Sequence, residues 1–112
     1  EEKKYGKEIG GDILEGKRTL MLIHLMQHCT KKELSEISNF LSVPIANRSA
    51  DKAAWILKLM HKYDCLGYSR GIAKYMAGAA LKEFYSVFSG LKDSKDKSLI
   101  ENIILYMINR DY

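Results

Sequence analysis

An all-α fold is the architecture that this sequence predicts, and three observations lead to it. Leu, Lys, Glu, Ala and Met are frequent in the chain, and all of them favour helices. The 112 residues contain a single proline, Pro44. Apolar residues recur at spacings of three and four, the pattern of a helix with one buried face. Because the connections between these helices are short, we expect an antiparallel helical bundle.

The first sixteen residues lack this pattern and are predicted to form a polar loop. Gly6, Gly10, Gly11 and Gly16 lie there among acidic and basic residues. Glycine lets the backbone approach a ligand closely, and such loops often carry binding residues. The chain also begins in a charged stretch without a capping residue or an initiating methionine, so we expect it to be part of a longer protein or to have a partner chain.

Two helices are predicted in the first half of the chain. One runs from Lys17 or Arg18 to about His28, where many Leu and Met and few β-branched residues favour a buried helix over a strand. The next runs from about Lys31 to Leu41. It follows a capping box in which Thr30 and Glu33 satisfy each other's free backbone amides.

Three more helices complete the chain. Pro44 ends the second helix, because the residue before a proline is pushed out of helical geometry. Ser49 caps a third helix that extends to the break at residues 64–67. The fourth helix is expected at about Tyr68–Ser89 and the fifth at about Lys95–Arg110. The fifth is predicted to bury its apolar side chains, which are those of Leu99, Ile100, Ile103, Ile104, Met107 and Ile108.

The composition excludes several classes of protein. The net charge is +4, and the basic residues are interleaved with acids, which suits a small anion and does not indicate nucleic acid. No run approaches the roughly 20 apolar residues that a membrane span needs, and the first residues do not resemble a signal peptide. Cys29 and Cys65 are expected to stay reduced. These features predict a cytoplasmic protein.

Residues Gly11 to Lys17 match the first part of a P-loop, Gly-x-x-x-x-Gly-Lys. Arg18 stands where a serine or threonine should hold magnesium, and no strand precedes the glycines, so we reject nucleotide binding. The longer stretch from Lys7 to Lys17 suits a diphosphate, because its two end lysines bring positive charge and Asp12 can hold Mg²⁺ together with phosphate oxygens. On spacing alone, a solvated loop explains these residues equally well.

The segment Gly6-Lys7-Glu8-Ile9-Gly10-Gly11-Asp12-Ile13-Leu14-Glu15-Gly16-Lys17-Arg18-Thr19-Leu20 closely resembles the stretch after the second aspartate-rich motif of trans-isoprenyl diphosphate synthases (polyprenyl synthetases). Three later segments are also similar to that family. They are Tyr68-Ser69-Arg70-Gly71-Ile72-Ala73, the turn Gly90-Leu91-Lys92-Asp93-Ser94, where Lys92 replaces the usual proline, and the end Asn109-Arg110-Asp111-Tyr112. The resemblance covers the whole chain.

This resemblance implies the C-terminal part of an isoprenoid synthase fold, with a substrate loop at residues 1–16 and helices at 17–112. It implies a prenyltransferase that condenses an allylic diphosphate with isopentenyl diphosphate, as farnesyl and geranylgeranyl diphosphate synthases do, with Mg²⁺ as cofactor. Lys7 and Lys17 match lysines that contact the diphosphate, and Asp12 matches an aspartate that supports the magnesium site. Arg110 can also meet a diphosphate, although a cation that complements the helix dipole is the simpler account.

Both Asp-Asp-x-x-Asp motifs of the family are absent from this sequence. We therefore expect the chain to be inactive by itself, and to form a homodimer or associate with the missing N-terminal part. An isolated segment of this kind should expose apolar surface. Two alternatives stay open, a non-catalytic prenyltransferase-like regulatory subunit and an unrelated helical interaction module.

Overall fold

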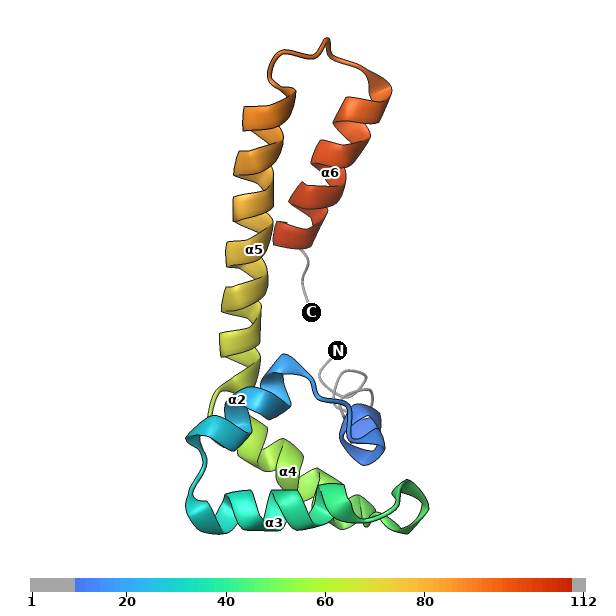
Figure 1. Cartoon of the computed structure of the whole chain (residues 1–112), viewed down its shortest axis with the longest axis vertical. Helices are drawn as coiled ribbons and strands as arrows, with labels where there is room; N and C mark the ends of the chain where they lie inside the picture. The colour runs from blue at the N-terminus through green and yellow to red at the C-terminus, as the bar shows by residue number, and fades with distance from the viewer. Residues whose placement is uncertain (1–9, 110–112) are drawn as a thin grey trace. The chain divides into compact units, whose positions relative to one another are not determined.

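The computed structural model describes residues 10–109, and this part of the chain consists of helices and connections without a strand, which confirms the predicted all-α class. Residues 10–15 are helical. They are followed by α2 (Leu20–His28), α3 (Lys31–Ser42), the short 3-10 helix η1 (Ile45–Asn47), α4 (Ala50–Lys62), α5 (Cys65–Phe88) and α6 (Lys95–Asn109) (Figure 1). No helix among the described residues combines the length and the apolar composition that crossing a membrane requires.

The chain divides into two compact units. The first unit ends at Ser69 and the second begins at Arg70, so the boundary falls within α5. The first unit contains the helical residues 10–15, α2, α3, α4 and the start of α5. The second contains the remainder of α5 together with α6.

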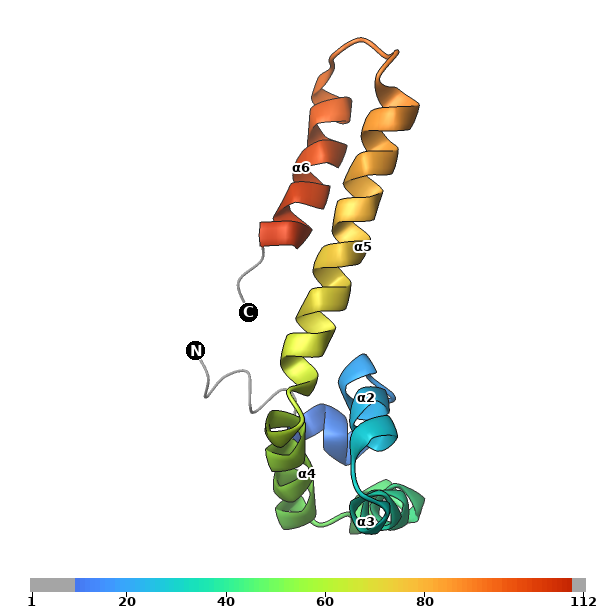
Figure 2. The same ribbon diagram turned by 90° about the vertical axis from the view of Figure 1, so that its left-hand side faces the viewer.

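The first unit is built around an apolar core. α2 contacts α4, and Ile37 of α3 and Ile56 of α4 are completely buried (Figure 2). Burying an aliphatic side chain of this size stabilises a fold by about 1.5–3 kcal/mol, so this cluster holds the unit together. Its buried members are Ile13, Leu22, Leu25, Ile37, Phe40, Ala53, Ile56, Leu59, Met60 and Cys65.

Local capping determines where most helices begin. The predicted capping box is confirmed, since Thr30 Oγ1 accepts from the Glu33 amide at 3.2 Å and the Glu33 carboxylate accepts from the Thr30 amide at 2.9 Å. Ser49 caps α4 as predicted. The first predicted helix begins later than expected, at Leu20, because the hydroxyl oxygen of Thr19 accepts from the amide of Leu22 at 3.2 Å.

The break before α5 is shorter than predicted. The helix begins at Cys65 rather than Tyr68, so only Tyr63 and Asp64 separate it from α4. Asp64 has a φ of 46°, in the left-handed region that turns the chain. A β-carbon at Gly67 would lie 2.5 Å from the Asp64 carboxylate oxygens, so the glycine lets this carboxylate lie over the first turn of α5.

The second unit is a helical hairpin. Its part of α5 and α6 run side by side and antiparallel in both ribbon views (Figures 1 and 2), and Tyr85 Oη donates to Glu101 Oε1 at 2.6 Å. The predicted burial of the apolar residues of α6 is wrong, because α6 has no buried residue and Ile103 is 53% exposed. Within this unit, two helices alone cannot enclose a core. The expected exposure of apolar surface is thus confirmed.

Candidate functional site

The segment that carries Asp12 and Lys17 begins as a helix, although the sequence predicted a loop through residue 16. Residues 10–15 are helical, and Ile13 is only 3% exposed because it packs into the core of the first unit. This burial offsets the low helix propensity of the glycines. The wrong prediction came from weighing local composition above the contact that Ile13 makes with distant residues.

Gly16 ends this helical segment. Its φ is 74°, its amide donates to Ile13 O at 3.0 Å, and the Lys17 amide donates to Asp12 O at 3.0 Å. These two bonds form the Schellman motif that commonly terminates helices at a glycine. Gly16 therefore turns the chain at the end of this helical segment. This role explains the Gly16-Lys17 sequence without a P-loop.

The structure brings two of the predicted site residues together. Lys17 Nζ donates to Asp12 Oδ1 at 2.7 Å and lies 3.2 Å from Glu15 Oε2. All three side chains face solvent in part, with 57%, 38% and 59% of their area exposed, respectively. Hydrogen bonds to Asp12 and Glu15 raise the pKa of Lys17, so its ammonium group keeps its charge at neutral pH. The predicted residues Lys7 and Arg110 lie outside the described residues.

The start of α2 lies next to Lys17 in the chain. Residues 17–19 link Gly16 to α2 in a non-helical conformation, and Thr19 is the N-cap. The positive end of the α2 dipole is therefore two residues beyond Lys17. Arg18 adds a second exposed cation. This short stretch thus joins two basic side chains, two carboxylates and a helix N-terminus.

The carboxylates of this stretch fit a supporting place in a magnesium site. No group of three or more His, Cys, Asp or Glu side chains within residues 10–109 is placed to hold a metal ion. Magnesium commonly takes one or two carboxylates, with phosphate oxygens and water as its other ligands. Asp12 and Glu15 both reach Lys17 and can supply such carboxylates. The described residues alone do not form a complete metal site.

Sequence reasoning missed Arg48, which binds the segment on which Asp12 lies. Arg48 Nη1 donates to Leu14 O at 2.7 Å, Nη2 to Leu41 O at 2.9 Å and Nε to Val43 O at 2.9 Å. These acceptors are backbone carbonyls, which carry no signal in the sequence. The one basic residue in the connection between α3 and α4 was the hint that the sequence offered.

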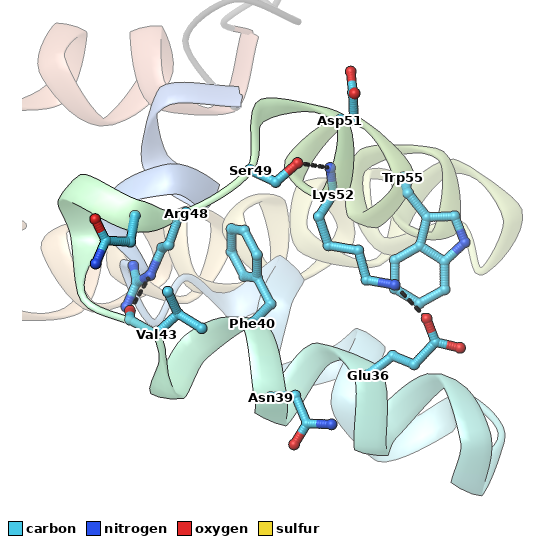
Figure 3. A pocket seen from close by; sticks show the side chains of 10 residues that line it. Glu36, Asn39, Phe40, Val43, Arg48, Ser49, Asp51, Lys52 and Trp55 are labelled. Carbon is cyan, nitrogen blue, oxygen red and sulfur yellow. Dashed lines mark hydrogen bonds and ion pairs between the residues drawn. The ribbon is translucent and has the colours of Figure 1, made fainter.

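Arg48 also lines a pocket between α3 and the start of α4. The pocket has a volume of about 720 Å³, and Phe40, Lys52 and Trp55 lie along its wall (Figure 3). Lys52 forms an ion pair with Glu36 and lies 4.0 Å from the centre of the Trp55 ring. Asp12 and Lys17 are not among its lining residues. The pocket is therefore separate from the candidate site.

Glu33 stabilises the first unit. Hydrogen bonds from Lys62, from the Thr30 amide and from Tyr63 lower the pKa of Glu33 from 4.5 to about 2. Lys62 Nζ lies 2.9 Å from one carboxylate oxygen and Tyr63 Oη lies 2.7 Å from the other. All partners belong to helix ends of the same unit, so this network joins α3 to α4 and is not aimed at a ligand.

The cysteines and two of the histidines of the first unit pack among their neighbours. Cys29 and Cys65 are free thiols, as expected, and burial raises the pKa of each. The rings of His24 and His28 are stacked with centroids 4.1 Å apart, and Tyr68 stacks on His24 at 3.9 Å. This stacking accounts for the two histidines without a metal ion.

Comparison with known proteins relates the chain to an enzyme of isoprenoid chemistry. It is 26% identical over 107 residues to the octaprenyl diphosphate synthase of Haemophilus influenzae, which is 96% of this chain and 30% of that protein. This similarity supports a link to polyprenyl synthases at the level of the family. The chain spans about a third of the length of this relative. No family model and no solved structure matches.

Proposed function

We propose that this chain is the C-terminal, diphosphate-facing part of a prenyltransferase that condenses an allylic diphosphate with isopentenyl diphosphate. The observation that carries the proposal is the 2.7 Å pair between Lys17 and Asp12. The pair lies in the segment that resembles isoprenyl diphosphate synthases. The similarity to octaprenyl diphosphate synthase extends over nearly the whole chain and supports the same origin.

In this proposal Lys17 stabilises the negative charge that develops on the departing diphosphate. A charge fixed where the transition state gains negative charge lowers the barrier of the reaction. Lys7 and Arg110 contribute further positive charge. When bound with the diphosphate, Mg²⁺ would supply electrostatic stabilisation of the same leaving group. Asp12 would orient Lys17 and help to hold the metal, whose other ligands the longer protein provides.

The test compares the intact protein with two lysine variants. Lys17→Ala is expected to weaken the binding of magnesium diphosphate and to lower kcat/KM for the allylic substrate by roughly tenfold or more, the usual loss for a charged hydrogen bond. Lys58→Ala is the matched control, because it removes one exposed charge from α4 and should change neither quantity. Equal activity of Lys17→Ala and the parent protein would contradict the proposal.

The 112-residue chain alone is expected to show no condensation. In the proposed function, most of the metal ligands belong to aspartate-rich motifs that this sequence lacks. Radiolabelled isopentenyl diphosphate measures this directly, since any prenyl product extracts into an organic phase. Turnover by the isolated chain would refute the assignment of catalysis to the longer protein.

A second candidate is a non-catalytic prenyltransferase-like subunit or helical interaction module. The exposed apolar side chains of the hairpin favour it, since large apolar patches mark contacts with other proteins. Tyr75, Met76, Ile103, Tyr106 and Met107 are all more than half exposed. A regulatory subunit would alter the activity of a complete synthase when mixed with it, and an unrelated module would bind no magnesium diphosphate.

A further inference from the structure

We propose that Arg48 is a positioning residue that fixes residues 12–17 and thereby places Asp12 and Lys17 for their ligand. The second half of this statement rests on the proposed function. The first half concerns only the contacts between Arg48 and the backbone of the first unit. Arg48 itself touches neither of the two site side chains through any hydrogen bond found among the described residues.

The guanidinium group of Arg48 joins the ends of two helices. Leu14 O belongs to the helical segment at residues 10–15, and Leu41 O belongs to the last turn of α3. The third acceptor is Val43 O, in the residue directly after α3 (Figure 3). Carbonyls at a helix C-terminus lack partners inside the helix, and a cation there also complements the dipole. The planar guanidinium group therefore donates hydrogen bonds to the carbonyls of both helix ends at once. The single, flexible ammonium group of a lysine would not do so.

Gly16 makes this approach feasible. A β-carbon at Gly16 would lie 2.5 Å from Arg48 Nη1 and 3.2 Å from Cζ, so any side chain there would push the guanidinium away. On another side, Arg48 Cζ lies 5.5 Å from the ring centre of Phe40, which is 6% exposed. The guanidinium is thus enclosed by a buried ring, three carbonyls and a glycine.

The helical segment depends on this support. Two tertiary contacts hold the described part of this helix, residues 10–15. Ile13 anchors one side of it in the core, and Arg48 holds Leu14 at the C-terminal turn. Lys17 follows three residues later, and its amide is bonded to Asp12 O. Loss of the Arg48 contact should therefore loosen the turn from which both site residues project.

Amide hydrogen exchange tests the positioning in the chain without ligand. We expect Arg48→Met and Arg48→Lys to speed exchange at the Gly16 and Lys17 amides by about tenfold or more, while amides in the middle of α4 keep their rates. Lys52→Met is the control, because Lys52 lines the same pocket and pairs with Glu36 without touching residues 10–17. Lys52→Met should leave the exchange rates of the Gly16 and Lys17 amides unchanged.

The functional half is tested in the intact protein by its affinity for magnesium diphosphate, with circular dichroism confirming that each variant is folded. Arg48→Lys should weaken binding about as much as Lys17→Ala, and Lys52→Met should not. If Lys17→Ala weakens binding but Arg48→Lys does not, the functional half of the inference is wrong and the proposed function stands. If Lys17→Ala has no effect, the proposed function fails, and the exchange rates alone decide the positioning. Unchanged exchange in both Arg48 variants overturns the inference.

Discussion

Replacing Gly16 by alanine adds one methyl group where both the backbone and a neighbour exclude it. The φ of 74° costs an L-residue about 1–2 kcal/mol. The new carbon would lie 2.5 Å from Arg48 Nη1, so the guanidinium must retreat and lose its bond to Leu14 O. A hydrogen bond from a charged donor contributes about 1.5–3 kcal/mol. The stiffer unfolded chain offsets about 0.4–1 kcal/mol of this loss.

Together these effects predict that Gly16→Ala lowers the free energy of unfolding of the first unit by about 2–4 kcal/mol. In an Arg48→Met background the displaced bond is already absent, so the same substitution should cost about 1 kcal/mol, the backbone effect alone. Urea titration followed by tryptophan fluorescence measures both values. Trp55 is the single tryptophan of the chain and lies in α4, so the signal reports on the first unit.

Gly11→Ala is the matched control within the same segment. Nothing lies within 4 Å of a β-carbon at Gly11, and its backbone is helical, so alanine should stabilise the unit by about 0.5–1 kcal/mol. A gain in stability from Gly11→Ala together with a loss from Gly16→Ala would identify the turn at Gly16 as the sensitive feature. An equal cost of Gly16→Ala in the parent and in the Arg48→Met background would refute the reasoning, because the contact with Arg48 would then contribute nothing.

Two further predictions concern stability. Ile56→Ala should cost the first unit about 2–5 kcal/mol, because Ile56 is completely buried, whereas Ile45→Ala at a 59% exposed position of the same unit should change stability by less than about 0.5 kcal/mol in the same denaturation assay. Glu33 has a folded pKa of about 2 and an ordinary pKa of 4.5, so its contribution is complete above the ordinary value and is lost as the pH falls toward 2. Glu33→Gln should therefore flatten the stability profile across that range, and an unchanged slope would contradict the role of Lys62.

Local signals in the sequence were sufficient for α3 and α4 and their starts. The capping box at Thr30 and Glu33 and the cap at Ser49 use side chains within three residues of the amides that they satisfy, so sequence order alone reveals them. The start of α2 was misplaced by two or three residues, because Thr19 was not considered as a cap. Such shifts are small, since each helix is defined by a longer apolar pattern.

Contacts between distant residues explain what sequence reasoning missed. The helical turn at residues 10–15 depends on burial of Ile13, and Arg48 acts on Leu14 from 34 positions away. The apolar pattern of α6 was recognised correctly, but a pattern indicates which face is apolar and not what covers it. Ile103 therefore satisfies the predicted spacing and still lies in solvent.

The charge balance around Lys17 limits what the candidate site can do without a metal ion. Asp12 and Glu15 both contact Lys17, so the two acids neutralise this cation and the adjacent Arg18. A bare diphosphate approaching Lys17 would meet two carboxylates at close range, and like charges repel. Mg²⁺ would reverse this interaction when bound, because the carboxylates of Asp12 and Glu15 could act as its ligands alongside phosphate oxygens. In the proposed function, Asp12 and Lys17 therefore act on a metal–diphosphate complex rather than on the anion alone.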